Sequence, residues 1–336
     1  MSLLELQPFG ITDPGKVRQN NEDALLVGDG KDETLFVVAD GVGGFEAGEV
    51  ASSLAVDVLR GLESGDSFER AIEEANRRIL AAGRDDERLS GMGTTVVAVR
   101  FGGTRREPVV ELAHVGDSRA YLVRGGELKP VTEDHSLVAD LVRSGDLTRD
   151  QAAEHPQKNL ITRALGAEDE VEVDTTVLPV EAGDRFVLCS DGLTDMLSDA
   201  EILDLLERDE DADASARRLV HAANSRGGED NITVVLFAFR DDAVALEETV
   251  RLTPDELPDA PAVDDDEDTL SGLEPVPAVT TAVVHASEIE RHLEQGPPPS
   301  RPSRPEPRAR RAILPLVLLV VLLLAIAALV LWGLWR

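Results

Sequence analysis

The sequence has few of the residues that define several common classes of protein. Its single cysteine, Cys189, excludes an internal disulfide, and aromatic residues make up only 3% of the chain, so the core must be built from aliphatic side chains. Basic residues are outnumbered, with 33 Lys and Arg against 65 Asp and Glu, which argues against nucleic-acid binding. The six histidines are scattered and form no Cys/His cluster, so no zinc site is predicted.

The one long uncharged run lies at residues 312–335. It is long enough to cross a bilayer, which takes about 20 apolar residues, and Trp332 and Trp335 lie at its far end, as interfacial aromatics do. Residues 308–311 contain three arginines, which places the preceding side in the cytoplasm by the positive-inside rule. The sequence therefore predicts a single-pass protein of the cell membrane with its larger part in the cytoplasm.

Composition divides the chain into three parts. Residues 1–240 alternate short apolar runs with helical patterns, as a folded domain does. Residues 241–311 are acidic and rich in Pro, and such a composition cannot bury enough apolar surface to fold alone. We therefore predict a domain at 1–240, a disordered acidic tether at 241–311 and a transmembrane helix at 312–335.

Within 1–240, strand patterns and helical patterns are grouped and do not alternate one by one. Apolar runs predict strands at Leu3–Gln7, Ala24–Val27, Leu35–Ala39, Thr94–Phe101, Val109–His114, Ala120–Val123, Val171–Leu178, Arg185–Cys189 and Ile232–Phe239. Helical periodicity predicts helices at Ala47–Leu62, Phe68–Ala82, Ser136–Ser144, Ser198–Glu207 and Ala212–Ser225. This grouping favours an α+β fold in which helices cover antiparallel sheets.

Five short polar motifs flank the predicted strands. They contain Arg18 with Glu22 and Asp23, Asp40-Gly41, Gly116-Asp117, Ser190-Asp191 and Asp230-Asn231. Four of the five place an Asp at the start or end of an apolar run, and in a sheet sandwich these ends can converge. Carboxylate oxygens suit Mg²⁺ or Mn²⁺, which can polarise a phosphoryl oxygen and lower the pKa of a bound water.

Each motif is weak alone, and two other interpretations exist. Asp-Gly is a frequent turn dipeptide, so chance accounts for one or two of these motifs. The Gly116-Asp117-Ser118 context also resembles that of a serine hydrolase nucleophile. That interpretation needs a histidine base with an Asp placed before it, and the sequence contains no Asp-x-x-His.

The order of seven motifs carries more information than any one of them. Arg-x-x-Asn-Glu-Asp, VVADGVGG, GMGTT, HVGDSRAY, LITRALG, LCSDGLTDML and EDNITVV follow one another between about residues 10 and 239. This series closely resembles the bacterial metal-dependent serine/threonine protein phosphatases of the protein phosphatase 2C-like (PPM) family. The resemblance implies a four-layer αββα sandwich of two antiparallel sheets flanked by helices, with metals in a cleft at one end.

The resemblance also implies roles for particular residues. Metal ligands would be provided by Asp40, Gly41, Asp117, Asp191 and Asp230. Asp40 would bridge two Mn²⁺ or Mg²⁺ ions, the Gly41 carbonyl would bind one of them, and Asp191 and Asp230 would hold the other. Asp117 would take part in a third metal site with Asp191.

Further positions would support this centre. Arg18 would bind the substrate phosphate and, with Asp40, form the catalytic pair. Weaker ligands or supports for ligands and waters would be Glu22, Asp23, Asn159 and Asn231. Residues 134–157 correspond to a flap beside the active site. Val42 stands where some eukaryotic members carry a histidine proposed as the general acid, so that group is not assigned here.

The expected function is hydrolysis of phosphoserine and phosphothreonine in proteins, without a covalent phosphoenzyme. A hydroxide activated by the two metals would attack phosphorus, on the cytoplasmic face of the membrane, and oppose serine/threonine kinases. Two alternatives remain open. One is a catalytically inactive adaptor that keeps the fold to bind partners, although every motif carboxylate is present. The other gives the acidic tether the main role, as a scaffold.

Overall fold

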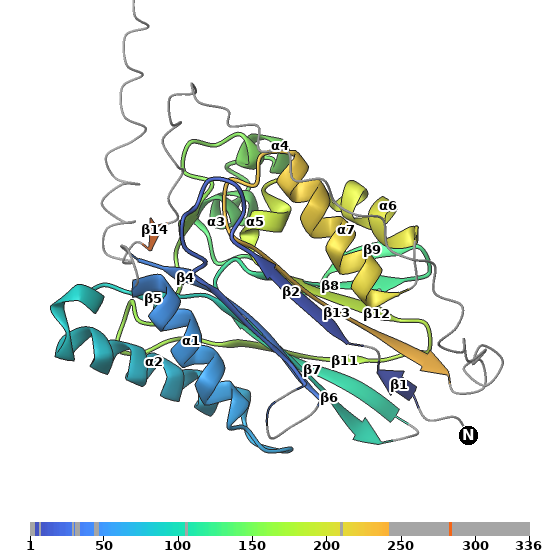
Figure 1. Cartoon of the computed structure of the whole chain (residues 1–336), viewed down its shortest axis with the longest axis horizontal. Coiled ribbons are helices and arrows are strands. Elements are labelled where there is room, and N and C mark those ends of the chain that lie inside the picture. Colours follow the sequence, from blue (N-terminus) through green and yellow to red (C-terminus); the bar gives the residue numbers. More distant parts are fainter. Residues whose placement is uncertain are drawn as a thin grey trace, which may run out of the picture. The chain divides into compact units, whose positions relative to one another are not determined.

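The computed structural model describes residues 4–6, 8–28, 30, 34–43, 47–104, 107–208, 211–241 and 282–283. These residues form two sheets with helices on the outer faces (Figure 1). Within them, no helix is both long and apolar enough to cross a membrane. The predicted transmembrane segment 312–335 and nearly all of the predicted tether lie outside the described residues.

The first sheet has the strand order β1-β13-β12-β8-β9, with β2 also paired to β13. Every pairing in it is antiparallel. Its strands are β1 (Leu4–Leu6), β2 (Phe9–Asp13), β8 (Arg119–Arg124), β9 (Glu127–Pro130), β12 (Arg185–Cys189) and β13 (Ile232–Asp241).

The second sheet has the order β11-β7-β6-β4-β3, with β5 paired to β4, and it is antiparallel throughout. Its strands are β3 (Asp23–Val27), β4 (Leu35–Val42), β5 (Gly93–Thr94), β6 (Val96–Thr104), β7 (Glu107–Val115) and β11 (Asp174–Pro179). A separate short pair joins β10 (Leu160–Ile161) in parallel to β14 (Ala282–Val283). The predicted tether is therefore not unstructured throughout.

The helices fall into two covering layers and one projecting segment. They are α1 (Ala47–Arg60), α2 (Phe68–Asp85), α3 (Leu137–Ser144), α4 (Arg149–Ala153), α5 (Asp191–Thr194), α6 (Asp199–Glu207) and α7 (Ala212–Ser225), with a 3₁₀ turn at Glu87–Leu89. Side-chain capping explains two of the starts. Ser136 accepts a hydrogen bond at the start of α3, and Ser198 forms a capping box with Glu201 at the start of α6.

Strand alternation produces the layers. In β4, Leu35 and Val37 face α1 and α2, whereas Phe36 and Val38 face the other sheet. In β12, Val187 and Cys189 face the α5–α7 layer, and their neighbours point between the sheets. Three apolar layers therefore separate four layers of secondary structure, which confirms the α+β sandwich of two antiparallel sheets flanked by helices.

Aromatic rings concentrate between the sheets. Phe36 of β4 stacks on Phe237 of β13 at 4.5 Å between centroids, and Phe186 stacks on the other side of Phe237 at 5.2 Å. These rings are fully buried. Burial of large side chains in the central layer fixes the two sheets face to face, and with them the relative position of their ends.

The structure departs from the predicted elements in several places. The predicted strand Thr94–Phe101 is two strands, because Thr95 leaves the ladder to hydrogen-bond Asp40 through its main-chain N–H and its hydroxyl. Strand β11 begins three residues later than predicted. The short elements β2, β9, α4 and α5 were not predicted, and Cys189 is buried as expected of a structural thiol.

Candidate metal centre

The predicted acidic residues lie at one end of the two sheets. Asp23 opens β3 and is paired in register with Asp40 of β4. In the other sheet, Asp191 directly follows β12, and Asp230 lies just before β13, which runs antiparallel to β12. Asp117 lies in the turn that leads from β7 in one sheet to β8 in the other. The sandwich therefore brings together carboxylates that are far apart in sequence.

The carboxylates repel one another strongly. Burial, and then the negative charges of its neighbours, raise the pKa of Asp40 well above the usual value; the neighbours are Asp23, Asp191, Asp230 and Asp117. Burial likewise raises the pKa of Asp23 and of Asp117 to about 7. Such crowding is unfavourable unless cations neutralise it.

Asp117 adds direct evidence for a missing partner. Its side chain is 7% exposed, and its Oδ1 atom has no hydrogen-bond partner among the described residues. A buried, unpartnered carboxylate oxygen beside other carboxylates fits a divalent-cation site, since Mg²⁺ and Mn²⁺ take oxygen ligands. The residues present therefore fit the group that the sequence predicts.

Hydroxyl groups hold Asp23 in place. Its Oδ2 atom accepts hydrogen bonds from Ser190 Oγ at 2.8 Å and from Thr233 Oγ1 at 2.6 Å. These donors come from the other sheet, so Asp23 links the two halves of the sandwich below the carboxylate cluster. The predicted supporting role of Asp23 agrees with this position, but Ser190 and Thr233 were not predicted.

Asn231 connects three polar motifs. Its side-chain oxygen accepts the Glu22 N–H at 2.7 Å, and its amide donates to the carbonyls of Pro14 and Asn20. Its own N–H donates to Asp230 Oδ1 at 2.8 Å. Asn231 therefore orients one candidate ligand and fixes the loop that carries Arg18, as predicted for a supporting residue.

The turn after Asp40 leaves no room for a side chain at Gly41. A Cβ atom there would lie 2.2 Å from the Gly48 carbonyl oxygen in α1. The Gly41 N–H donates to the Glu22 carbonyl at 3.1 Å. The next residue, Val42, is buried against Ile161 and Ala164, so no titratable side chain occupies this position.

Arg18 lies against the cluster. Its Nη2 atom donates to Asp230 Oδ2 at 2.7 Å, and both side chains are about one-fifth exposed. A guanidinium at the rim of a group of carboxylates partly neutralises them, and it is also the group best suited to bind phosphate.

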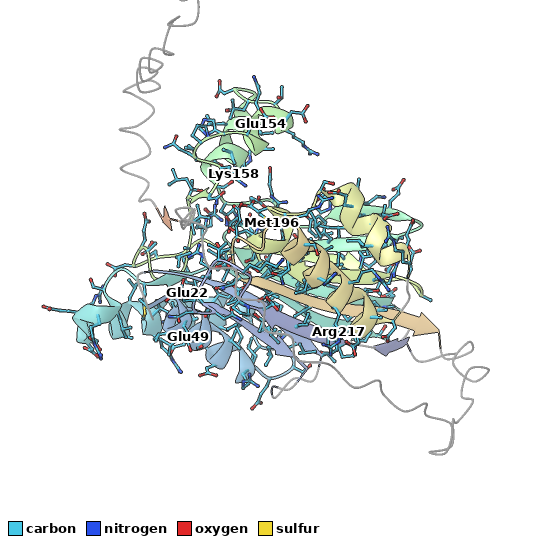
Figure 2. All side chains as sticks on the ribbon, turned by 45° about the horizontal axis from the view of Figure 1, so that its top comes forward. Glu22, Glu49, Glu154, Lys158, Met196 and Arg217 are labelled. Atoms are coloured by element: carbon cyan, nitrogen blue, oxygen red, sulfur yellow. The ribbon has the colours of Figure 1, made fainter. Side chains whose placement is uncertain are left out.

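A cavity of about 680 Å³ opens beside Asp117 and Asp191, and Asn159 lines it. Its roof is the segment that carries α3 and α4, within the predicted flap. Lys158 bridges from this segment to Asp195 at 2.8 Å. Figure 2 shows Lys158 between Glu154 at the far end of the segment and Met196 after α5. The structure thus places Asn159 beside the candidate third site.

The profile of protein phosphatase 2C matches residues 16–236, which is most of the described chain. The chain belongs to the protein phosphatase 2C family. A serine/threonine phosphatase, stp, from Listeria welshimeri is 42% identical over 237 residues, covering 67% of this chain and 92% of that protein. The serine/threonine protein phosphatase PstP of Mycobacterium tuberculosis is 44% identical over 232 residues, covering 67% of this chain and 43% of that protein.

Solved structures agree with this membership of the 2C family. A crystal structure of Mycobacterium tuberculosis PstP superposes with a TM-score of 0.64 at 40% identity, covering 71% of this chain and all of that one. The PstP catalytic domain with two manganese ions superposes with a TM-score of 0.63 at 39% identity, with the same coverage. The predicted family, and with it the class of metal-dependent serine/threonine protein phosphatase, is confirmed.

Proposed function

We propose that this 2C-family chain hydrolyses phosphoserine and phosphothreonine in proteins, with Mn²⁺ or Mg²⁺ at the carboxylate cluster. The observation that carries this proposal is the convergence of Asp40, Asp117, Asp191 and Asp230 at one end of the sandwich, with Arg18 beside them. A relative at 39% identity has two manganese ions in its catalytic domain, which supports the choice of metal.

The carboxylates would divide the metals between them. Asp40 stands closest to all the other acids in electrostatic terms, which suits a shared ligand. The Gly41 carbonyl would complete one site, and Asp191 and Asp230 the other. Asp117 and Asp191, with Asn159 a further candidate, would form a third site at the cavity. When bound, the metals supply Lewis acidity toward the phosphoryl oxygens and an activated water.

Arg18 would bind the phosphate of the substrate. Its guanidinium is held by Asp230 at 2.7 Å and is therefore already oriented toward the cluster. A cation on Asp230 would compete for this carboxylate and leave Arg18 donors for phosphate oxygens. Phosphoryl transfer depends mainly on positioning and charge neutralisation, and both are provided by this arrangement.

The test is hydrolysis of a phosphothreonine peptide by the full chain with and without Mn²⁺. We expect turnover with the metal, and its loss in Asp40→Asn, which keeps the shape of the side chain but removes the charge. If the wild type is inactive, or if Asp40→Asn makes no difference, the enzyme proposal is wrong. The catalytically inactive adaptor is then favoured.

We also propose that residues 312–335 anchor the phosphatase to the membrane, with its catalytic part in the cytoplasm. There it would oppose serine/threonine kinases and act on their substrates. The uncharged run and the three arginines before it support this topology. A fluorescent fusion at Met1 that is accessible from outside intact cells would contradict it. Deleting 241–336 should release the protein from the membrane and leave catalysis in solution intact, an outcome that a main role for the tether as scaffold would not give.

A further inference from the structure

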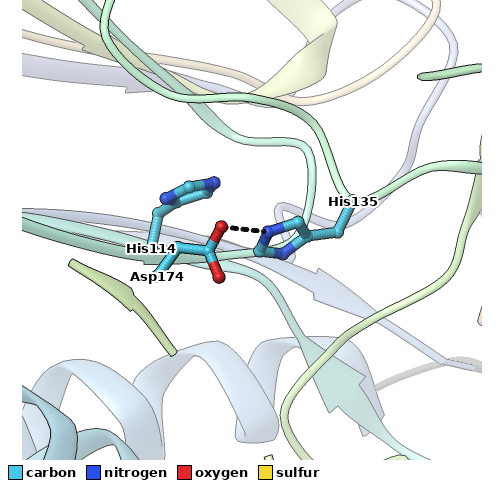
Figure 3. A group of neighbouring side chains, drawn as sticks. All are labelled: His114, His135 and Asp174. Atoms are coloured by element: carbon cyan, nitrogen blue, oxygen red, sulfur yellow. Dashed lines mark ion pairs between the residues drawn. The ribbon is translucent and has the colours of Figure 1, made fainter. Parts of the chain in front are cut away.

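A second polar cluster lies outside the carboxylate centre. His114 of β7, His135 and Asp174 of β11 come together below the flap (Figure 3). Both imidazoles are about 95% buried, and their rings stack at 4.6 Å. Their ligand-type atoms lie within 4.8 Å of one another, so by residue type alone the cluster could hold a metal ion.

The hydrogen bonds assign a different state to His135. Its Nδ1 atom accepts the Gly116 N–H at 3.1 Å, so the proton of the neutral ring lies on Nε2 and points at Asp174 Oδ2, 3.3 Å away. Burial, and then the charges of neighbouring groups, lower the pKa of His135 to about 4, which keeps the ring neutral.

Arg163 closes the arrangement on its other side. Its Nη1 atom donates to Asp174 Oδ1 at 2.8 Å and to the Glu172 carbonyl at 3.2 Å, and it lies 3.1 Å from His135 Nε2. A metal on Nε2 would have to displace the ring proton next to this guanidinium. His114 donates to the Glu133 carbonyl from its Nε2 atom, which leaves only its Nδ1 atom to bind a metal. One available nitrogen does not make a metal site.

His135 holds the metal-side loop from two directions. Besides accepting the Gly116 N–H, it donates its own main-chain N–H to the Gly116 carbonyl at 2.9 Å. Gly116 has φ +109, and a Cβ atom there would lie 2.6 Å from the side chain of Thr95, so the loop has one tight path. Asp117, with its unpartnered buried oxygen, is the next residue. The His135 carbonyl also accepts the Thr162 N–H at 2.8 Å, which joins the loop to β10.

We propose that His135 is a positioning residue for Asp117. Asp174 and Arg163 fix the imidazole in the Nε2–H form, and the imidazole fixes Gly116 and thereby the direction of the Asp117 carboxylate. His135 immediately precedes Ser136, the cap of α3, so the start of the flap and the candidate third metal site depend on one side chain. The proposal rests on the proposed function only for the identity of Asp117 as a metal ligand.

Substitutions at His135 separate positioning from mere folding. Asn places an amide oxygen where Nδ1 stands and can accept the Gly116 N–H, whereas Gln and Ala cannot. In calorimetric titration of the full chain with Mn²⁺, we expect His135→Ala and His135→Gln to weaken the Asp117-dependent site about 10-fold or more, and His135→Asn to restore it. Asp117→Ala identifies that site, and His155→Ala, a second flap histidine, is the matched control and should change nothing.

Equal affinity in the Ala, Gln and Asn variants would overturn the proposal. Because these measurements follow binding, they remain decisive if the wild type has no phosphatase activity, in which case only the proposed function is lost. If the Ala and Gln variants fail to fold, the wild type and Asn variant are compared directly, and a weakened site in a folded Asn variant contradicts the positioning role.

The ring itself provides a second measurement. With ¹⁵N-labelled histidine in the full chain, His135 should show a protonated Nε2 and an unprotonated Nδ1 from pH 6 to 8. Asp174→Ala should populate the other tautomer as well. A protonated Nδ1 in the wild type would overturn the assignment. So would binding of one equivalent of Zn²⁺ at His114 and His135, because it would make the cluster a metal site.

Discussion

Removing divalent cations should make the stability of this phosphatase fall as pH rises. The pKa of the buried Asp23 is raised from 3.8 to about 7 in the folded chain, mainly by burial. A carboxyl whose pKa is raised on folding favours the folded state only while it is protonated. Its contribution is therefore complete below pH 4 and is lost as pH rises to 7. A shift of about 3 pKa units corresponds to about 4 kcal/mol, of which about 2.5 kcal/mol falls between pH 5 and 7.5.

The other carboxylates act in the same direction. Burial also raises the pKa of Asp117 to about 7, and the pKa values of Asp40 and Asp191 are raised well above the usual range. Saturating Mn²⁺ should reverse the trend, because cations bind the ionised form and release protons. Stability should then rise with pH over the same interval.

Urea unfolding followed by circular dichroism, at pH 5 and 7.5, measures both trends in chelator and in Mn²⁺. Asp23→Asn is the matched variant, since its amide oxygen can accept from Ser190 and Thr233 but its side chain cannot ionise. In chelator it should remove about 2.5 kcal/mol of the fall. A free energy of unfolding that stays level or rises with pH in chelator, or an unchanged slope in Asp23→Asn, would refute the reasoning.

Three further substitutions test other parts of the structure. Arg18→Ala should lower kcat/KM for a phosphopeptide roughly 100-fold or more in steady-state assays, because a charged donor to the transition state is lost; unchanged kinetics would exclude Arg18 from phosphate binding. Lys158→Ala breaks the ion pair with Asp195 and should cost under about 1 kcal/mol in urea unfolding, yet change KM for a phosphopeptide more than for a small aryl phosphate. Phe237→Ala should lower the free energy of unfolding by about 3–5 kcal/mol, and a loss below about 1 kcal/mol would contradict the central packing layer.

The sandwich and its acidic end could be predicted because their signals are local. Leu35–Ala39 is an apolar run that stops at Asp40, and the burial of both faces of β4 is visible in its unbroken hydrophobicity. The order of the motifs then related this Asp to Asp191 and Asp230. These positions needed no knowledge of packing.

The remaining elements depend on contacts that are distant in sequence. Strand β2 contains a glycine and is short, and its pairing with β13 is what makes it a strand. Ser190 lies 167 residues from its hydrogen-bond partner Asp23, and nothing local indicates that contact. His135 reads as a helix-start residue in the sequence, and only the fold brings it to Gly116 and Asp174.

The central claim is that the carboxylates at the end of the sandwich hold the catalytic cations. The most direct measurement is an anomalous difference map at the manganese edge, from crystals of the protein grown with Mn²⁺. We predict peaks on both sides of the Asp40 carboxylate, one of them beside Asp191 and Asp230. A map with no peak at Asp40, or with its main peak at His114, His135 and Asp174, would contradict the account.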